Sequence, residues 1–120
     1  MSAVMMIADS RLSAEMWISL RALLASHTAM YSIARPKDAL TITTEDAHSI
    51  SVIATRGTLH WTAPDALGTG TWQLTFQHAI QKNDRGRFEF TDEGFLRFDG
   101  AAETLELEAA VEHQLRKLQG

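Results

Sequence analysis

The stretch that decides the fold is ALTITTEDAHSISVIATRGTLHWTAPDALGTGTWQLTFQHAIQ, residues 39–81. Runs in which apolar and polar residues alternate occupy 39–44, 48–55, 58–63 and 71–81. This period of two predicts β-strands with one apolar and one polar side. The charged residues of the stretch are Glu45, Asp46, Arg56 and Asp65. All four fall where the chain is expected to turn, so the polar side of these strands consists of Ser, Thr, Gln and His.

Short strands are also expected around Phe88 and Phe90 and around Leu96 and Phe98. Together these runs predict a curved antiparallel meander of about six strands. The run 71–81 has the cleanest alternation and is expected to be a long central strand. Residues 82–86 (Lys-Asn-Asp-Arg-Gly) predict a polar hairpin tip.

Along the chain, one helix is expected before the predicted strands and one after them. Apolar residues at helical spacing predict the first helix over about 13–33, with Ser13 as the N-cap and Pro36 just beyond its end. A second helix is expected over about 102–118. Leu105 would point away from the apolar face of this second helix. Residues 104–107 are therefore an alternative short strand, in which case the helix starts later. The predicted fold is therefore α+β: an N-terminal helix, the meander and a C-terminal helix.

Composition restricts the function classes. The chain has 120 residues, a net charge of −4 and no cysteine. This length suits one domain over 1–120, with 1–9 as a flexible or docked arm. Without cysteine there is no disulfide, thiolate zinc site or thiol catalysis. An acidic protein is a poor ligand for nucleic acid, although Lys82, Arg85 and Arg87 gather near one hairpin. No segment predicts a membrane span or signal peptide, so we expect a cytoplasmic protein.

No pattern for catalysis, metal binding or cofactor binding is found. The histidines form neither an HxH nor an HExxH pattern, and the serines lack a GxSxG elbow, so no metal ligand, cofactor or catalytic residue is predicted. His27 lies in the apolar stripe of the first helix, and His78 continues the inward parity of the run 71–81. If the interior were hollow, a small-ligand cavity would be lined by His27, Trp61, Trp72, Phe76 and His78. Otherwise these residues are packed in the core.

The uncharged side of the strands predicts a contact surface. Hydroxyl and amide groups can form hydrogen bonds across an interface without the cost of desolvating a charge. The residues predicted on this surface are Thr41, Thr43, Thr58, His60, Thr62, Thr71, Gln73, Thr75 and Gln77. A second uncharged stripe on the first helix consists of Ile18, Ala22, Ala25 and Ala29. It is either a further contact surface or a solvent-facing side in which alanine favours the helix.

These observations favour a non-enzymatic binding or assembly module, expected to form a homodimer through the uncharged sheet face. A protein partner or an uncharged small molecule would also suit that face. The alternative is a cone-shaped ligand-binding domain, or a small isomerase- or hydratase-like enzyme, with a cavity between the first helix and the sheet.

Overall fold

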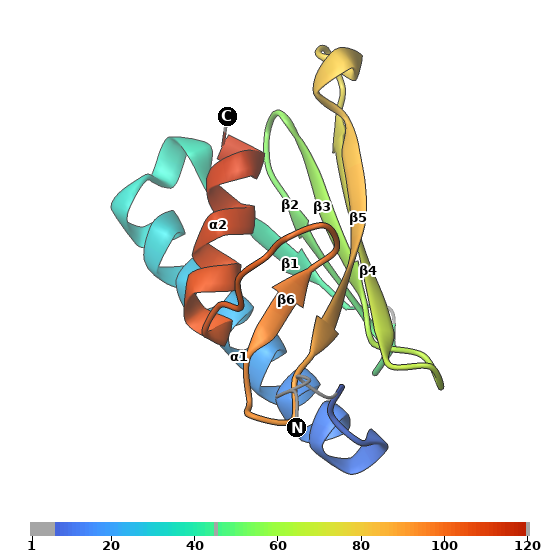
Figure 1. Ribbon diagram of the computed structural model, residues 1–120. Coiled ribbons are helices and arrows are strands. Elements are labelled where there is room, and N and C mark those ends of the chain that lie inside the picture. The colour runs from blue at the N-terminus through green and yellow to red at the C-terminus, as the bar shows by residue number, and fades with distance from the viewer. Residues whose placement is uncertain (1–6, 45, 120) are drawn as a thin grey trace.

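The computed structural model describes residues 7–44 and 46–119. Its helices are α1 (Ser10–Ala34) and α2 (Leu107–Gln119), with short 3-10 turns η1 (Pro36–Asp38) and η2 (Ile80–Lys82). Its strands are β1 (Thr41–Thr43), β2 (Ser49–Ile53), β3 (Gly57–Thr62), β4 (Thr69–Phe76), β5 (Asp84–Phe90) and β6 (Leu96–Phe98). The six strands form one sheet in sequence order, and each neighbouring pair is antiparallel. The predicted α+β fold is confirmed (Figure 1).

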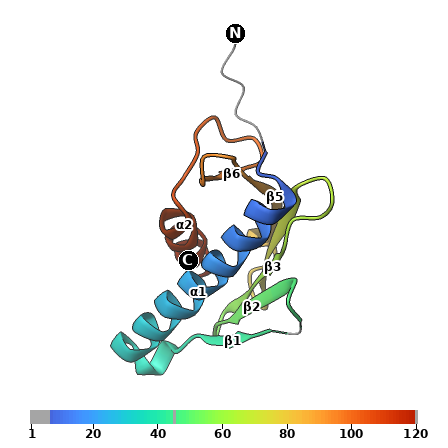
Figure 2. The same ribbon diagram turned by 90° about the horizontal axis from the view of Figure 1, so that it is seen from below.

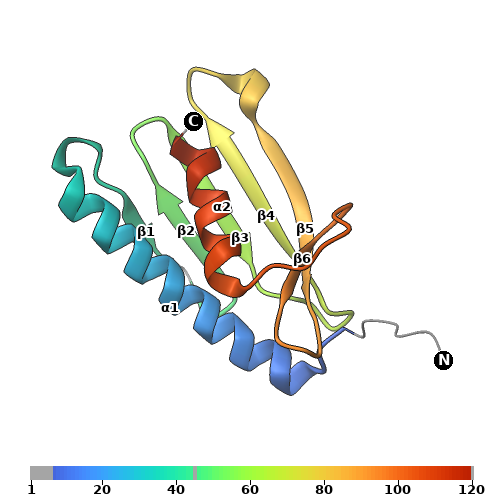
Figure 3. The same ribbon diagram turned by 60° about the vertical axis from the view of Figure 1, so that its left-hand side comes forward.

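Both helices lie on the same side of the curved sheet (Figure 2). α1 crosses the sheet near β1, and α2 packs over β3 and beside α1 (Figure 3). Neither α1 nor α2 covers the other side of the sheet. The fold is therefore a two-layer arrangement in which one sheet face is buried and the opposite face is left to solvent or to another molecule.

The core forms where the apolar side of the strands meets the helices. Along β3 and β4 the side chains alternate between buried and more exposed, as the period of two predicts. Leu59 and Trp61 on β3 are 0% exposed, as are Leu20 and Leu24 on α1. Each such side chain contributes about 1.5–3 kcal/mol when it leaves water. These positions hold α1 against the sheet.

Glycines on β4 and β5 make room for aromatic rings on the neighbouring strand. The register pairs Gly70 with Phe88 and Trp72 with Gly86. A Cβ atom at Gly70 would lie 2.3 Å from Phe88, and one at Gly86 would lie 2.7 Å from Trp72. Each ring therefore lies across the glycine opposite it, which packs the two strands tightly and disfavours a slipped register.

An aromatic cluster connects α2 to the far strands of the sheet. The Phe98 ring lies 6.1 Å from Trp61 and 6.3 Å from Trp72, and His113 of α2 lies 5.6 Å from Phe98. Burial of the imidazole lowers the pKa of His113, and the charges of Lys117 and Arg116 add to that effect. The neutral form of the His113 imidazole is therefore favoured over the charged form where it contacts Phe98.

Some predicted boundaries of the helices are wrong. α1 begins at Ser10 rather than near Ser13, because the Asp9 carboxylate accepts a hydrogen bond from the Leu12 amide at 2.8 Å and acts as the N-cap. At the other end of the chain, Leu105 forms an isolated β-bridge with Leu96, and α2 starts at Leu107. Of the two alternatives for this segment, the later helix start is therefore correct.

The long strand predicted over 71–81 ends early. β4 stops at Phe76, whose amide donates to the Asn83 side chain at 2.7 Å instead of continuing the ladder. The chain then turns through η2, and Asp84 already belongs to β5. The hairpin tip therefore precedes residue 84. The prediction of a tip at 82–86 is wrong for residues 84–86, which belong to β5.

The N-terminal arm is partly docked. The Ala8 amide donates to the Phe90 carbonyl at 2.9 Å, Ala8 is buried, and Ile7 bridges Thr91. Residues 1–6 of the predicted arm, and the turn residue Glu45, lie outside the described residues.

Gln114 is a polar exception in the core. Its side chain is 0% exposed, and neither its amide nitrogen nor its amide oxygen has a hydrogen-bond partner in the described part of the chain. A buried amide without partners costs about 1–3 kcal/mol. Methionine has a similar length and has no amide group that needs hydrogen-bond partners.

We therefore predict that Gln114→Met raises the free energy of unfolding by about 1 kcal/mol, measured by chemical denaturation. Gln81→Met, which makes the same change at an exposed site, is the matched control and is expected to have little effect. A marked loss of stability in Gln114→Met alone would show that the amide has partners after all.

Candidate functional site

The predicted contact residues of the strands share the uncovered side of the sheet. The strand register places Thr58 opposite Thr75 and His60 opposite Gln73. The strand members of this surface, which we call the polar face, are Thr41, Thr43, Ser51, Ile53, Thr58, His60, Thr62, Thr71, Gln73 and Thr75. Gln77, also predicted here, is exposed in the bend after β4 and is not part of a strand.

His60 is the one titratable side chain among these residues. Its Nδ1 atom lies 2.6 Å from the Ser51 hydroxyl on the neighbouring strand, and the ring is half-buried. When Nδ1 is unprotonated it accepts a hydrogen bond from the Ser51 hydroxyl, which leaves the Nε2–H group for a contact outside the chain. The centre of the polar face is therefore ordered by cross-strand contacts.

A charged border, which the sequence analysis missed, bounds the polar face at β5 and β6. Arg85 pairs in register with Gln73 and Arg87 with Thr71, so both arginines lie on the same side as the polar face. Arg97 forms an ion pair with Glu89. Neither Arg85 nor Arg87 forms an ion pair within residues 7–44 and 46–119. The alternation Arg85, Arg87, Glu89 is a strand pattern, whereas the sequence predicts a hairpin tip at Arg85 and a strand only around Phe88 and Phe90.

A shallow hollow lies where the polar face meets this border. Its volume is about 540 Å³, and its lining includes His60, Thr62, Gln73, Arg85 and Arg87. The lining also includes Asp99, so one carboxylate lies beside the two guanidinium groups, and the hydroxyl and amide groups of the hollow can both donate and accept hydrogen bonds.

The predicted helix stripe lies on another side of the molecule. Ile18, Ala22, Ala25 and Ala29 are exposed on the side of α1 that faces away from the sheet, and Ile18 is 65% exposed. Neither α2 nor the sheet covers them. The stripe belongs to the helix layer and the polar face to the uncovered side of the sheet, so they are separate surfaces.

Of the residues predicted to line a ligand cavity, Trp61 and Trp72 pair in register on β3 and β4, but the two histidines do not join them around a hollow. Trp61, Trp72 and Phe76 are packed in the core, and the Trp61 ring lies 4.9 Å from Phe88. His78 is exposed in the bend that follows β4. Since β4 ends at Phe76, the inward parity assigned to His78 is wrong, and it does not face His27.

A groove does exist beside α1, at a different place. It has a volume of about 750 Å³ and lies between the first half of α1 and the loops around 47–48 and 63–68. Its lining includes the exposed apolar side chains Ile7, Ile18 and Leu67. Three exposed apolar residues around one hollow are typical of a surface that receives an apolar group.

Trp17 and Arg21 form one wall of this groove. The Trp17 indole donates to the Ala47 carbonyl at 2.8 Å, and Arg21 Nη1 donates to the same oxygen at 3.4 Å. The Nε atom of Arg21 is buried, and no partner for it lies among the described residues. The groove thus combines apolar walls with the Arg21 guanidinium and with the carboxylates of Asp9 and Asp65, which accept hydrogen bonds from backbone amides.

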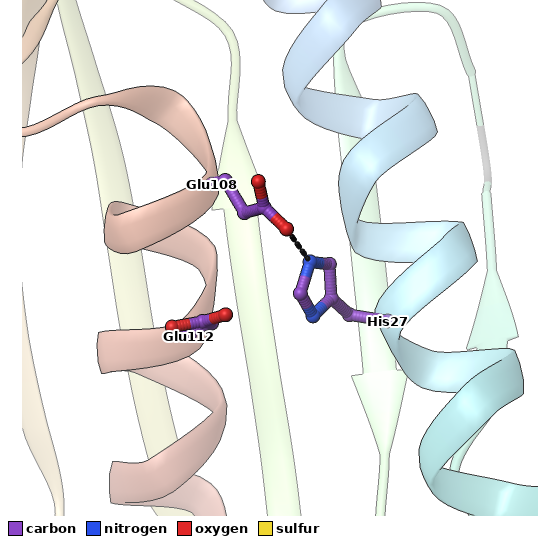
Figure 4. Close-up of side chains that lie close together, drawn as sticks. All are labelled: His27, Glu108 and Glu112. Atoms are coloured by element: carbon purple, nitrogen blue, oxygen red, sulfur yellow. Dashed lines mark hydrogen bonds and ion pairs between the residues drawn. The ribbon is translucent and has the colours of Figure 1, made fainter.

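A cluster of side chains with metal-binding atoms lies between the two helices (Figure 4). His27 Nε2 on α1 is 3.1 Å from Glu108 Oε1 on α2. Glu112, one turn further along α2, completes a group whose donor atoms all lie within 4.8 Å of one another. His27 and Glu108 are 81 residues apart in the sequence, so no local motif could indicate this cluster.

No helix in residues 7–44 and 46–119 is long and apolar enough to cross a membrane. Comparisons of the chain with protein families, with curated proteins and with solved structures find no match. The proposals below therefore depend on the geometry alone.

Proposed function

We propose that this protein is a non-enzymatic binding or assembly module that forms a homodimer through the polar face of its sheet. The observation that supports this best is the placement of α1 and α2 on one side of the sheet, which leaves the polar face uncovered by either helix. Strands β1 to β4 contain no Asp, Glu, Lys or Arg.

Open sheets that remain in water usually carry charged residues, which prevent association between sheets and between sheet edges. The polar face lacks this protection. Its Ser, Thr and Gln side chains can exchange hydrogen bonds with water for hydrogen bonds with a partner at little cost, whereas a buried charge would cost several kcal/mol. Exposed Ile53 adds an apolar contact at the same surface.

The charged border suggests how two copies would be arranged. A two-fold axis parallel to the strands would place Arg85 and Arg87 of one copy over β1 and β2 of the other. The positive ends would then avoid each other, and the guanidinium groups would lie at the water-accessible rim of the contact, beside hydroxyl groups such as those of Thr43 and Ser51. Such an isologous contact closes as a dimer and does not extend into a filament.

We predict that the wild-type chain is a dimer at micromolar concentration and that Gln73→Lys is monomeric under the same conditions. The lysine would bury an unpaired charge in the centre of the contact, which weakens the dissociation constant by at least about 100-fold. Sedimentation equilibrium measures both masses.

Gln81→Lys makes the same change on η2, outside the polar face, and is expected to remain dimeric. Thermal melting of both variants checks that they are folded. A wild-type chain that is monomeric throughout the micromolar range would contradict the proposal, and so would a Gln73→Lys chain that dimerises as tightly as the wild type.

The groove beside α1 supports a second candidate function, the binding of a small amphipathic molecule. Its volume of about 750 Å³ suits a ligand of this class. The apolar walls would receive a hydrocarbon or aromatic group, and Arg21 would pair with an anionic end. The enzymatic form of this alternative required His27 and His78 to face one hollow, which they do not.

We predict that the fluorescent probe 8-anilinonaphthalene-1-sulfonate, which has an aromatic body and an anionic group, binds saturably to the native chain. Ala14→Trp, which fills the groove, should reduce its affinity by about tenfold. Ala22→Trp, on the same helix but outside the groove, is the matched control. Equal binding to both variants would place the probe elsewhere and contradict this candidate.

A further inference from the structure

The seam between α1 and α2 brings a nitrogen donor and two carboxylates to one point. Glu108 and Glu112 are four residues apart on α2 and therefore project from the same side of that helix. His27 projects toward them from α1 (Figure 4). The three residues are held on regular helices, and α1 and α2 are packed against each other, so the backbone positions of the donors are fixed.

The donor separations suit a small divalent cation. Ligand atoms at about 2.0–2.1 Å from a tetrahedral zinc ion lie roughly 3.3 Å from one another. His27 Nε2 and Glu108 Oε1 are already 3.1 Å apart. All three donor atoms lie within 4.8 Å of one another, so they would have to approach by at most about 1.5 Å to coordinate one ion.

A simple contact between the helices does not explain why Glu112 lies beside the pair of His27 and Glu108. The pair of His27 and Glu108 is by itself an adequate link between α1 and α2. Glu112 forms no ion pair within the described residues, although Arg116 lies one turn further along α2. A second carboxylate beside the imidazole adds negative charge without a partner, which is the arrangement that a cation would neutralise.

The cluster is open to water on one side. A hollow of about 300 Å³ is lined by His27, Glu112, Tyr31, Leu115 and Arg116, among others. Three protein ligands and an open position for water are the usual arrangement of an accessible zinc site. The hollow supplies an entry path, while the nearby Arg116 guanidinium lowers the affinity for any cation.

We propose that His27, Glu108 and Glu112 bind a zinc-type first-row divalent cation, which links α1 to α2. The mixed imidazole and carboxylate set favours Zn²⁺ over Mg²⁺ and Ca²⁺, which prefer oxygen ligands alone. This site goes beyond the assembly function proposed above, since it lies between the helices and not on the polar face. The role proposed for the ion is structural, and no catalytic step is assigned to it.

The test is calorimetric titration of the full, chelator-treated chain with zinc sulfate at neutral pH, together with thermal melting. We expect one ion per chain with a micromolar dissociation constant, and a melting temperature that rises with zinc concentration. Magnesium sulfate at the same concentration should leave the melting temperature unchanged. Absence of saturable zinc binding would overturn the proposal.

Variants separate this site from surface binding. Glu112→Gln removes one ligand without touching the pair of His27 and Glu108, and should weaken zinc binding by about tenfold or more while its melting temperature without metal stays near that of the wild type. His27→Gln should abolish binding. His78→Asn, at an exposed histidine, is the control and should bind as the wild type does.

Binding that survives Glu112→Gln unchanged, or that is lost in His78→Asn, would overturn the proposal. In the first case the cluster is only a contact between helices, and in the second zinc binds to surface histidines. If His27→Gln fails to fold, the comparison of Glu112→Gln with the wild type still decides, because Glu112 makes no ion pair among the described residues that folding would lose.

Discussion

Burial of one side of the β3–β4 pair beneath the two helices is the constraint on which the rest of the structure depends. Leu59 and Trp61 face the helices, so every second residue of β3 must face the other way. Antiparallel pairing then transmits this parity to the neighbouring strands. The polar face is thus a direct consequence of the core, because the side chains that the helices do not cover are the alternate ones.

This constraint separates the surfaces of the molecule. The sheet offers hydroxyl and amide groups bordered by two arginines, whereas the exposed side of α1 offers alanines and Ile18. Only the first combines an ordered strand register with four strands, β1 to β4, that carry no charged side chain, and for this reason we base the assembly function on it. The groove beside α1 and the cluster between the helices arise at the borders of the same two layers, where side chains do not pack in a regular pattern.

Sequence periodicity predicted the sheet and both helices correctly because burial on one side produces a regular repeat. The predictions failed where a single side chain overrides the repeat. Asn83 accepts the amide hydrogen of Phe76 and ends β4, although apolar alternation continues to Ile80. Asp9 caps α1 ahead of Ser13 in the same way. Such contacts depend on one rotamer and leave no periodic signal.

The sequence by itself determined that this chain folds as helix, meander and helix, with an uncharged polar side on the strands within 39–81, because the spacing of apolar residues is a local property. Only the tertiary structure decided which residues meet across long separations. It moved His78 to an exposed bend, placed Arg85 and Arg87 beside the polar face, and brought His27 next to Glu108. The physical reason is that these positions follow from how whole helices and strands pack, and packing joins residues that no sequence spacing relates.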